Sequence, residues 1–151
     1  MDASQAELIG DKIISLFPLV RRRLLPSRDE HAHSHASHLW IRVLGMLQHL
    51  GILPVSEIGR RLCISKPHMT SLINMMAEQG LVKRQPDKID RRIINIMITS
   101  KGCSFMDESR KMLKENIKKN LSSLSNSDVQ LLASSLENIR KVLLKLDEKQ
   151  K

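Results

Sequence analysis

The segment 92–99, RIINIMIT, constrains the fold most, because it has the pattern of a β-strand in a chain whose other apolar residues recur at helical spacing. Its isoleucines at 94, 96 and 98 alternate with residues 93, 95 and 97, and β-branched side chains favour strands. A second short run, LVKRQ at 81–85, precedes it, and the basic turn 88–92 separates the two. The sequence therefore predicts one small β-hairpin, with cations at its tip, in a mostly α (α+β) protein.

Apolar spacing and helix-end residues predict six helices around this hairpin. A Ser4–Glu7 capping box opens the first helix, which runs to about Leu25 and is kinked or restarted at Pro18. Ser65 is the expected N-cap of the fourth helix, and Ser125 that of the last. The six helices cover about residues 4–25, 37–50, 55–62, 66–79, 100–121 and 126–146, with an extended connection at 52–54.

The charge distribution favours a polyanionic partner. The 151-residue chain carries a net charge of +9, and residues 54–101 hold nine Lys or Arg against four Asp or Glu. With one Trp, two Phe and no Tyr, the chain offers few surfaces for stacking on unpaired bases. Any binding to nucleic acid must therefore use cations and an inserted helix.

The start of the chain and its two cysteines indicate a cytoplasmic protein. The first residues include acids and no apolar leader, and no apolar run approaches the roughly 18 residues of a membrane span. Cys63 and Cys103 form no CxxC pair, and we expect both to be structural rather than redox sensors. The sequence has no defensible Ser-His-Asp order, phosphate-binding glycine loop or paired apolar carboxylates, so we expect neither an enzyme nor a bound cofactor.

The order helix, helix, tight turn, helix, hairpin is that of a winged helix-turn-helix. The helix at 66–79 has an apolar inner face and an outer face of small, polar or basic residues that fits a major groove. The hairpin can place cations against phosphates or in the minor groove, with Asp90 holding the Arg92 guanidinium by a bidentate pair, although a merely solvated turn is the alternative. The predicted DNA-contacting residues are Ser65, Lys66, Pro67, His68, Thr70, Ser71, Asn74, Arg84, Lys88, Asp90, Arg91 and Arg92.

Residues 55–102 resemble the MarR family of bacterial and archaeal transcription regulators. Ser56–Gly59 is similar to the family's S-E-L-A motif, and Met76–Arg84 to its L-x-x-x-G-L-V-x-R motif. Asp90–Arg92 and Ile98–Gly102 look like the D-x-R of the family's wing and the L-T-x-x-G that follows it. The resemblance implies a regulator of transcription, with repression favoured over activation, that binds double-stranded DNA as an obligate homodimer and responds to a small-molecule effector.

The apolar stripes of the first and last helices agree with a homodimer. They recur at 4-3-4 and 4-3-4-3 spacing, the latter typical of a coiled-coil seam, although packing within one chain is the alternative. The resemblance implies that these helices interleave between two chains, which present two recognition helices to a pseudo-palindromic operator. We expect one MarR-like domain over 1–151, with dimerisation helices at 1–36 and 104–151 and a winged helix-turn-helix lobe at 37–103. The predicted interface residues are Ile9, Ile13, Leu16, Val20, Leu132, Leu136, Ile139, Leu143 and Leu146.

Two further groups of residues are candidates for sensing. The resemblance implies a small, often anionic aromatic effector between the dimer helices and the winged lobe, with an Arg from 21–23 as counter-ion and a lining drawn from Phe17, Trp40, Leu44 and Met106. A metal-responsive regulator is an alternative to a solvated loop, because imidazole suits zinc, nickel or copper and four histidines lie close together, His31, His33, His35 and His38. A non-specific architectural DNA-binding protein is a further alternative, since charge alone supports such binding.

Overall fold

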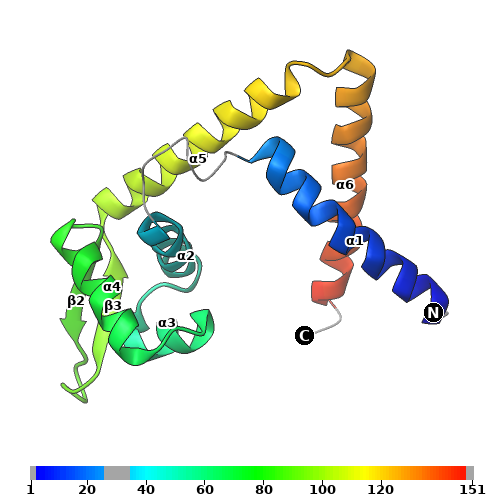
Figure 1. Cartoon of the computed structure of the whole chain (residues 1–151). Helices are drawn as coiled ribbons and strands as arrows, with labels where there is room; N and C mark the ends of the chain where they lie inside the picture. Colours follow the sequence, from blue (N-terminus) through cyan, green and yellow to red (C-terminus); the bar gives the residue numbers. More distant parts are fainter. Residues whose placement is uncertain (1–2, 26–34, 149–151) are drawn as a thin grey trace. The chain divides into compact units, whose positions relative to one another are not determined.

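The computed structural model describes residues 3–25 and 35–148, in which six helices and three strands form a winged helix-turn-helix protein (Figure 1). The elements in chain order are α1 Ala3–Leu24, α2 His35–Leu50, β1 Leu53–Pro54, α3 Val55–Leu62, α4 Lys66–Glu78, β2 Val82–Pro86, β3 Ile94–Ile98, α5 Ser100–Leu121 and α6 Asn126–Glu148. The mostly helical fold class expected from the sequence is confirmed.

The chain divides into two compact units. The sheet unit, Ser27–Leu113, holds all three strands together with α2, α3, α4 and the first half of α5. The helical unit consists of Met1–Pro26 and Lys114–Lys151, and thus of α1, the end of α5 and α6. Within residues 3–25 and 35–148, no helix is both long and apolar enough to cross a membrane.

Strand β3 is the centre of a three-stranded antiparallel sheet in the order β1-β3-β2. β2 pairs with β3 along its whole length, which confirms the predicted hairpin. The prediction of a two-stranded ribbon was incomplete, because β1 adds a third strand to the sheet. In this strand Leu53 pairs with Ile96 and Pro54 pairs with Asn95. That strand is too short for alternation to reveal it, and its edge position tolerates a proline, which donates no hydrogen bond.

The predicted N-cap of the last helix is confirmed. The Ser125 Oγ accepts a hydrogen bond from the Asp128 backbone N–H at 3.2 Å and lies 2.6 Å from the Asp128 carboxylate, as expected for an N-cap. Helix α1, which was expected to open at Ser4, includes this residue and begins at Ala3, the first described residue. The same helix continues past Pro18, which therefore does not restart it.

The sheet unit is held together by one apolar core. Four residues of α4, at positions 69, 72, 73 and 76, point into it, which confirms the predicted inner face of that helix. The first turns of α5 add Met106. The buried residues of the core are Val43, Leu44, Leu47, Ile58, Leu62, Met69, Leu72, Ile73, Met76, Leu81, Val82, Ile96 and Met106.

The helical unit has no comparable core. Among the described residues of α1 and α6, no side chain is buried. Eight of the nine residues predicted to form a dimer interface are exposed, and the ninth, Leu132, is half-buried. Packing within one chain, the alternative explanation of these stripes, therefore leaves most of their apolar surface in water.

The end of α4 is joined to the start of α5 by a close contact around Thr99. The Thr99 Oγ1 lies 2.7 Å from the Gly80 carbonyl oxygen and accepts the Gly102 backbone N–H at 3.0 Å, so it caps α5 and holds the turn after α4. Gly80 itself ends α4 in a left-handed conformation, with φ 71°. A Cβ at Gly102 would lie 2.3 Å from the Leu81 carbonyl oxygen, so only glycine fits there.

We expect Gly102→Ala to destabilise the protein by about 2 kcal/mol, because the added methyl group collides with backbone that cannot move independently. Urea unfolding followed by circular dichroism measures this loss. Gly45→Ala is the matched control, since its Cβ would meet only the Met106 side chain at 3.8 Å and alanine is the better helix former. Equal stability of the two variants would contradict the close contact.

Candidate nucleic-acid interface

The outer face of α4 presents the predicted recognition residues together. Ser65 has the extended backbone of an N-cap and its carbonyl oxygen accepts the Met69 N–H at 2.9 Å, but its side chain makes no capping bond. Thr70 is half-buried, and its Oγ1 donates to the Lys66 carbonyl oxygen at 2.9 Å. The remaining side chains of this face are exposed, namely Lys66, Pro67, His68, Ser71 and Asn74.

A hydrogen bond joins this helix to the first strand of the wing. The Nη1 of Arg84, on β2, donates to the Oδ1 of Asn74, on α4. Both residues were predicted to contact DNA, and here each restrains the direction of the other. The recognition helix and the wing therefore share a surface in which the guanidinium and the amide are already oriented.

The tip of the wing is organised by Asp87. Its Oδ1 accepts the backbone N–H groups of Ile89 at 2.9 Å and Asp90 at 3.2 Å, and its Oδ2 accepts the Asn95 side-chain amide at 2.9 Å. Its own backbone N–H donates to the Ile93 carbonyl oxygen at 2.9 Å. The two backbone hydrogen bonds, and then the Asn95 bond, hold the pKa of Asp87 below its usual range, because they stabilise the ionised carboxylate.

The predicted pairing of Asp90 with the Arg92 guanidinium is wrong. The Asp90 Oδ1 accepts the backbone N–H of Arg92 at 3.0 Å, and no ion pair joins these two described side chains. An aspartate two residues before an N–H reaches that group more readily than the distant guanidinium. The cations of the wing tip, Lys88, Arg91 and Arg92, are exposed, and Ile89 stands among them with its surface 97% exposed.

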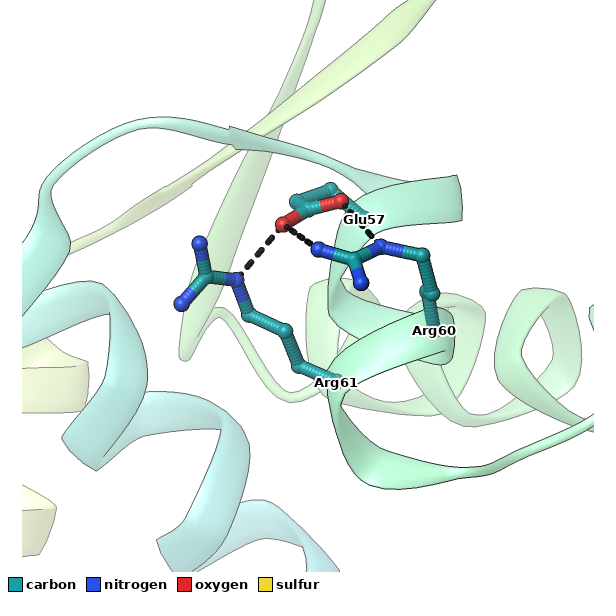
Figure 2. A network of polar contacts seen from close by, with 3 residues as sticks. All are labelled: Glu57, Arg60 and Arg61. Atoms are coloured by element: carbon teal, nitrogen blue, oxygen red, sulfur yellow. Dashed lines mark hydrogen bonds and ion pairs between the residues drawn. The ribbon is translucent and has the colours of Figure 1, made fainter.

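A carboxylate on α3 holds two arginines (Figure 2). The Arg60 guanidinium donates its Nε and Nη2 to the two Glu57 oxygens at 2.9 and 2.7 Å, and the Arg61 Nε donates at 2.6 Å to the oxygen that Nη2 contacts. The hydrogen bonds from Arg60 and then Arg61 lower the pKa of Glu57 to about 2, so this carboxylate is ionised at neutral pH. The network lies on the exposed side of α3, whose buried side packs through Ile58 and Leu62.

Sequence reasoning missed the residues that organise this surface. Asp87 precedes a turn, where aspartate side chains commonly accept backbone N–H groups, and that signal could have identified it. Glu57 stands three and four residues before Arg60 and Arg61, the spacing at which helix side chains meet. The hydrogen bonds of Asp87 with Asn95 and of Arg84 with Asn74 depend on strand register and packing, so no pattern in the local sequence predicts them.

Three of the four residues proposed for the effector pocket belong to the core of the sheet unit or pack against it. Leu44 and Met106 are buried in that core. Trp40 packs against the ring of Phe105, with centroids 6.2 Å apart, and its Nε1 has no hydrogen-bond partner in the described part of the chain. Phe17 is exposed on α1, in the other unit, so the effector pocket as a whole stays a prediction.

The histidine cluster lies mostly beyond what the structure describes. His31 and His33 are outside the described residues, as is the side chain of His35, while His38 is exposed on α2. Among residues 3–25 and 35–148, no group of three potential metal ligands lies together. The two cysteines are free thiols, with Cys63 exposed in the left-handed C-cap of α3 and Cys103 half-buried at the start of α5.

A polar recognition helix beside a cationic wing defines a DNA-binding protein of the winged helix-turn-helix class. Residues 37–94 match the model of the MarR family. The chain is 24% identical over 133 residues to the HTH-type transcriptional regulator MhqR of Bacillus subtilis (strain 168), a match that covers 85% of this chain and 92% of MhqR. The winged helix-turn-helix of this chain thus matches the MarR family, and the relative similar to it over most of its length is named an HTH-type transcriptional regulator.

Two further comparisons agree with this assignment. The HTH-type transcriptional repressor IacR of Pseudomonas putida is 28% identical over 96 residues, which cover 64% of this chain and 58% of IacR. The crystal structure of a putative transcriptional regulator from Pseudomonas aeruginosa PA01 superposes with a TM-score of 0.71 at 19% identity, covering 95% of this chain and 98% of that one. The structural likeness establishes the fold over nearly the whole chain.

We expect the wing tip to stay folded well into the acid range. Because the pKa of Asp87 is lowered, its contribution is present at neutral pH and is lost only as the pH falls through that lowered pKa. In an NMR titration, the Ile89 and Asp90 amide signals should therefore shift with a midpoint below the ordinary aspartate value of about 3.9. Asp87→Asn should abolish this titration, and a midpoint at or above the ordinary value would contradict the assigned hydrogen bonds.

Proposed function

We propose that this protein is a MarR-family transcriptional regulator, a homodimeric repressor that recognises a pseudo-palindromic operator in the cytoplasm and releases it when a small molecule binds. The observation that carries the proposal is the outer face of α4, where five exposed polar or small side chains lie beside a wing whose tip has three exposed cations. In this proposal α4 enters the major groove, and the wing follows the backbone into the adjacent minor groove.

The residues divide by the kind of contact that their chemistry allows. His68, Ser71 and Asn74 can exchange hydrogen bonds with base edges, and Thr70 offers its methyl group. Lys66 and the wing cations are suited to phosphates, which set register without specifying sequence. The Ser65 hydroxyl, which makes no capping bond, is available as a donor to a phosphate beside the start of α4.

The proposal of a homodimer is supported by the helical unit. Helices of 22 and 23 residues that have no buried side chain at positions 4–24 and 126–146 cannot be stable through intrachain packing, because helix stability in water comes chiefly from burying an apolar face. The residues left in water include Ile13, Ile139 and Leu143, each about half exposed. A second copy offers the same stripes, so that 1–36 and 104–151 serve as dimerisation segments around the winged lobe 37–103.

The proposed repression and effector response have separate support. IacR, a relative of this chain, is named a repressor, and a dimer seated on a promoter blocks polymerase by occupancy alone. Trp40 has a ring N–H that lacks a partner in the described structure, and a ligand with a hydrogen-bond acceptor would satisfy it. A ligand that favours one spacing of the two recognition helices would shift DNA affinity by its differential binding.

Binding to the DNA upstream of the protein's own gene tests the specific regulator against the architectural alternative. We expect fluorescence anisotropy to report binding that survives excess competitor DNA. Arg92→Ala should weaken it and reduce the slope of log affinity against log salt by about one for each protomer bound, while sedimentation shows the oligomeric state of the wild type. If competitor abolishes binding equally at every sequence, the architectural reading replaces the regulator.

We expect Ile139→Glu to dissociate the dimer and to lower operator affinity at least about tenfold, since one recognition helix alone loses the benefit of linked half-sites. Analytical ultracentrifugation at micromolar concentration measures the first effect and anisotropy the second. Lys141→Glu places the same carboxylate at an exposed position of the same helix and should remain dimeric. An Ile139→Glu protein that still sediments as a dimer would remove α6 from the interface.

A further inference from the structure

We propose that Arg60 and Arg61, held by Glu57, form a phosphate-binding clamp on α3 that grips the DNA backbone beside the groove entered by α4. This inference rests on the proposed use of α4 as the recognition helix. It adds to the interface a third element, distinct from the recognition helix and the wing, and assigns to Glu57 the role of a positioning residue.

The hydrogen bonds within the network leave most of each guanidinium available. A guanidinium has five N–H donors, of which Arg60 uses two on Glu57 and Arg61 uses one. The side chain of Arg60 is 71% exposed and that of Arg61 is 43% exposed, whereas Glu57 is the most enclosed of the three at 27%. The carboxylate is therefore the anchor, and the two cations face outward from it (Figure 2).

The position of the network in the fold places it close to the start of the recognition helix. Arg60 and Arg61 lie in the last turn of α3, and only residues 63–65 separate that helix from α4. This turn is tight, because the Ile64 N–H donates to the Gly59 carbonyl oxygen at 2.9 Å, and a Cβ at Gly59 would lie 3.6 Å from the Met69 side chain. In helix-turn-helix proteins the first helix crosses the DNA backbone while the second enters the groove.

The charges of the network fit a phosphate partner better than a purely structural role. Two fixed arginines against one carboxylate leave a net positive charge on an eight-residue helix. Because the pKa of Glu57 is about 2, the carboxylate stays charged and keeps both side chains in place throughout the physiological range. A guanidinium oriented in advance loses less rotational freedom when it binds phosphate, so the carboxylate can strengthen DNA binding despite its own charge.

The effect of Glu57→Ala on DNA affinity tests this role, because a positioning residue and a simple surface charge predict changes in opposite directions. If Glu57 were only a surface charge, Glu57→Ala would tighten DNA binding, because it removes a negative charge near a polyanion. If Glu57 positions the clamp, the same substitution weakens binding several-fold. Glu78→Ala is the matched control, since it removes one exposed carboxylate from the end of α4 and should tighten binding slightly.

Arg60→Gln/Arg61→Gln supplies an independent readout. Loss of two phosphate contacts per protomer should reduce the salt slope of binding by about two for each protomer bound, whereas loss of a helix-stabilising pair alone would leave the slope unchanged. All variants are full-length, and anisotropy is measured at a temperature where circular dichroism shows each to be folded. An unchanged slope, or tightening by Glu57→Ala equal to that by Glu78→Ala, would overturn the clamp.

The failure of the clamp can be distinguished from failure of the proposed function. The salt slopes are measured on a duplex of arbitrary sequence as well as on the upstream DNA, because all duplexes share the phosphate backbone. If the wild-type protein binds both duplexes equally well, the proposed sequence-specific regulator is overturned. The difference in salt slope between wild type and the arginine variant still tests the clamp. Wild-type protein that binds neither duplex overturns both.

Discussion

The close approach of Gly102 to Leu81 is the constraint on which the DNA-facing surface depends. The start of α5 can rest on the turn after α4 only because residue 102 has no side chain, and Thr99 then bonds to both segments through one hydroxyl group. The strand that follows this turn carries Arg84, whose guanidinium bonds to Asn74 on the recognition helix. The join between the end of α4 and the wing thus rests on a contact in which the Leu81 backbone and the Ile98 side chain leave no room for a Cβ at residue 102.

Carboxylates in the basic part of the chain shape the surface instead of neutralising it. Of the four acids in residues 54–101, Glu57 binds two guanidinium groups, and Asp87 and Asp90 bind backbone N–H groups of the wing. Only Glu78 stands apart at the end of α4. Glu57 orients two arginine side chains, and Asp87 and Asp90 fix the backbone of the wing tip from which the exposed cations extend.

The sequence predicted correctly those features that depend on residues close together in the chain. The inner face of α4 was predicted correctly because Met69, Leu72, Ile73 and Met76 repeat at helical spacing. The pairing of Asp90 with the Arg92 side chain was wrong because a short carboxylate satisfies a neighbouring backbone N–H first, and β1 was missed because two residues carry no periodicity. The contacts of Arg84 and Asn95 depend on strands that meet only in the folded chain, so spacing alone could not reveal them.

The wing tip described around Asp87 is self-contained. Its hydrogen bonds join only residues 87–95, and none of them reaches the apolar core. These nine residues therefore determine the shape of the loop by their own hydrogen bonds. Substitutions at Lys88, Ile89 and Arg91, whose side chains take no part in that bonding, can diversify the wing between related regulators while the scaffold beneath it stays the same.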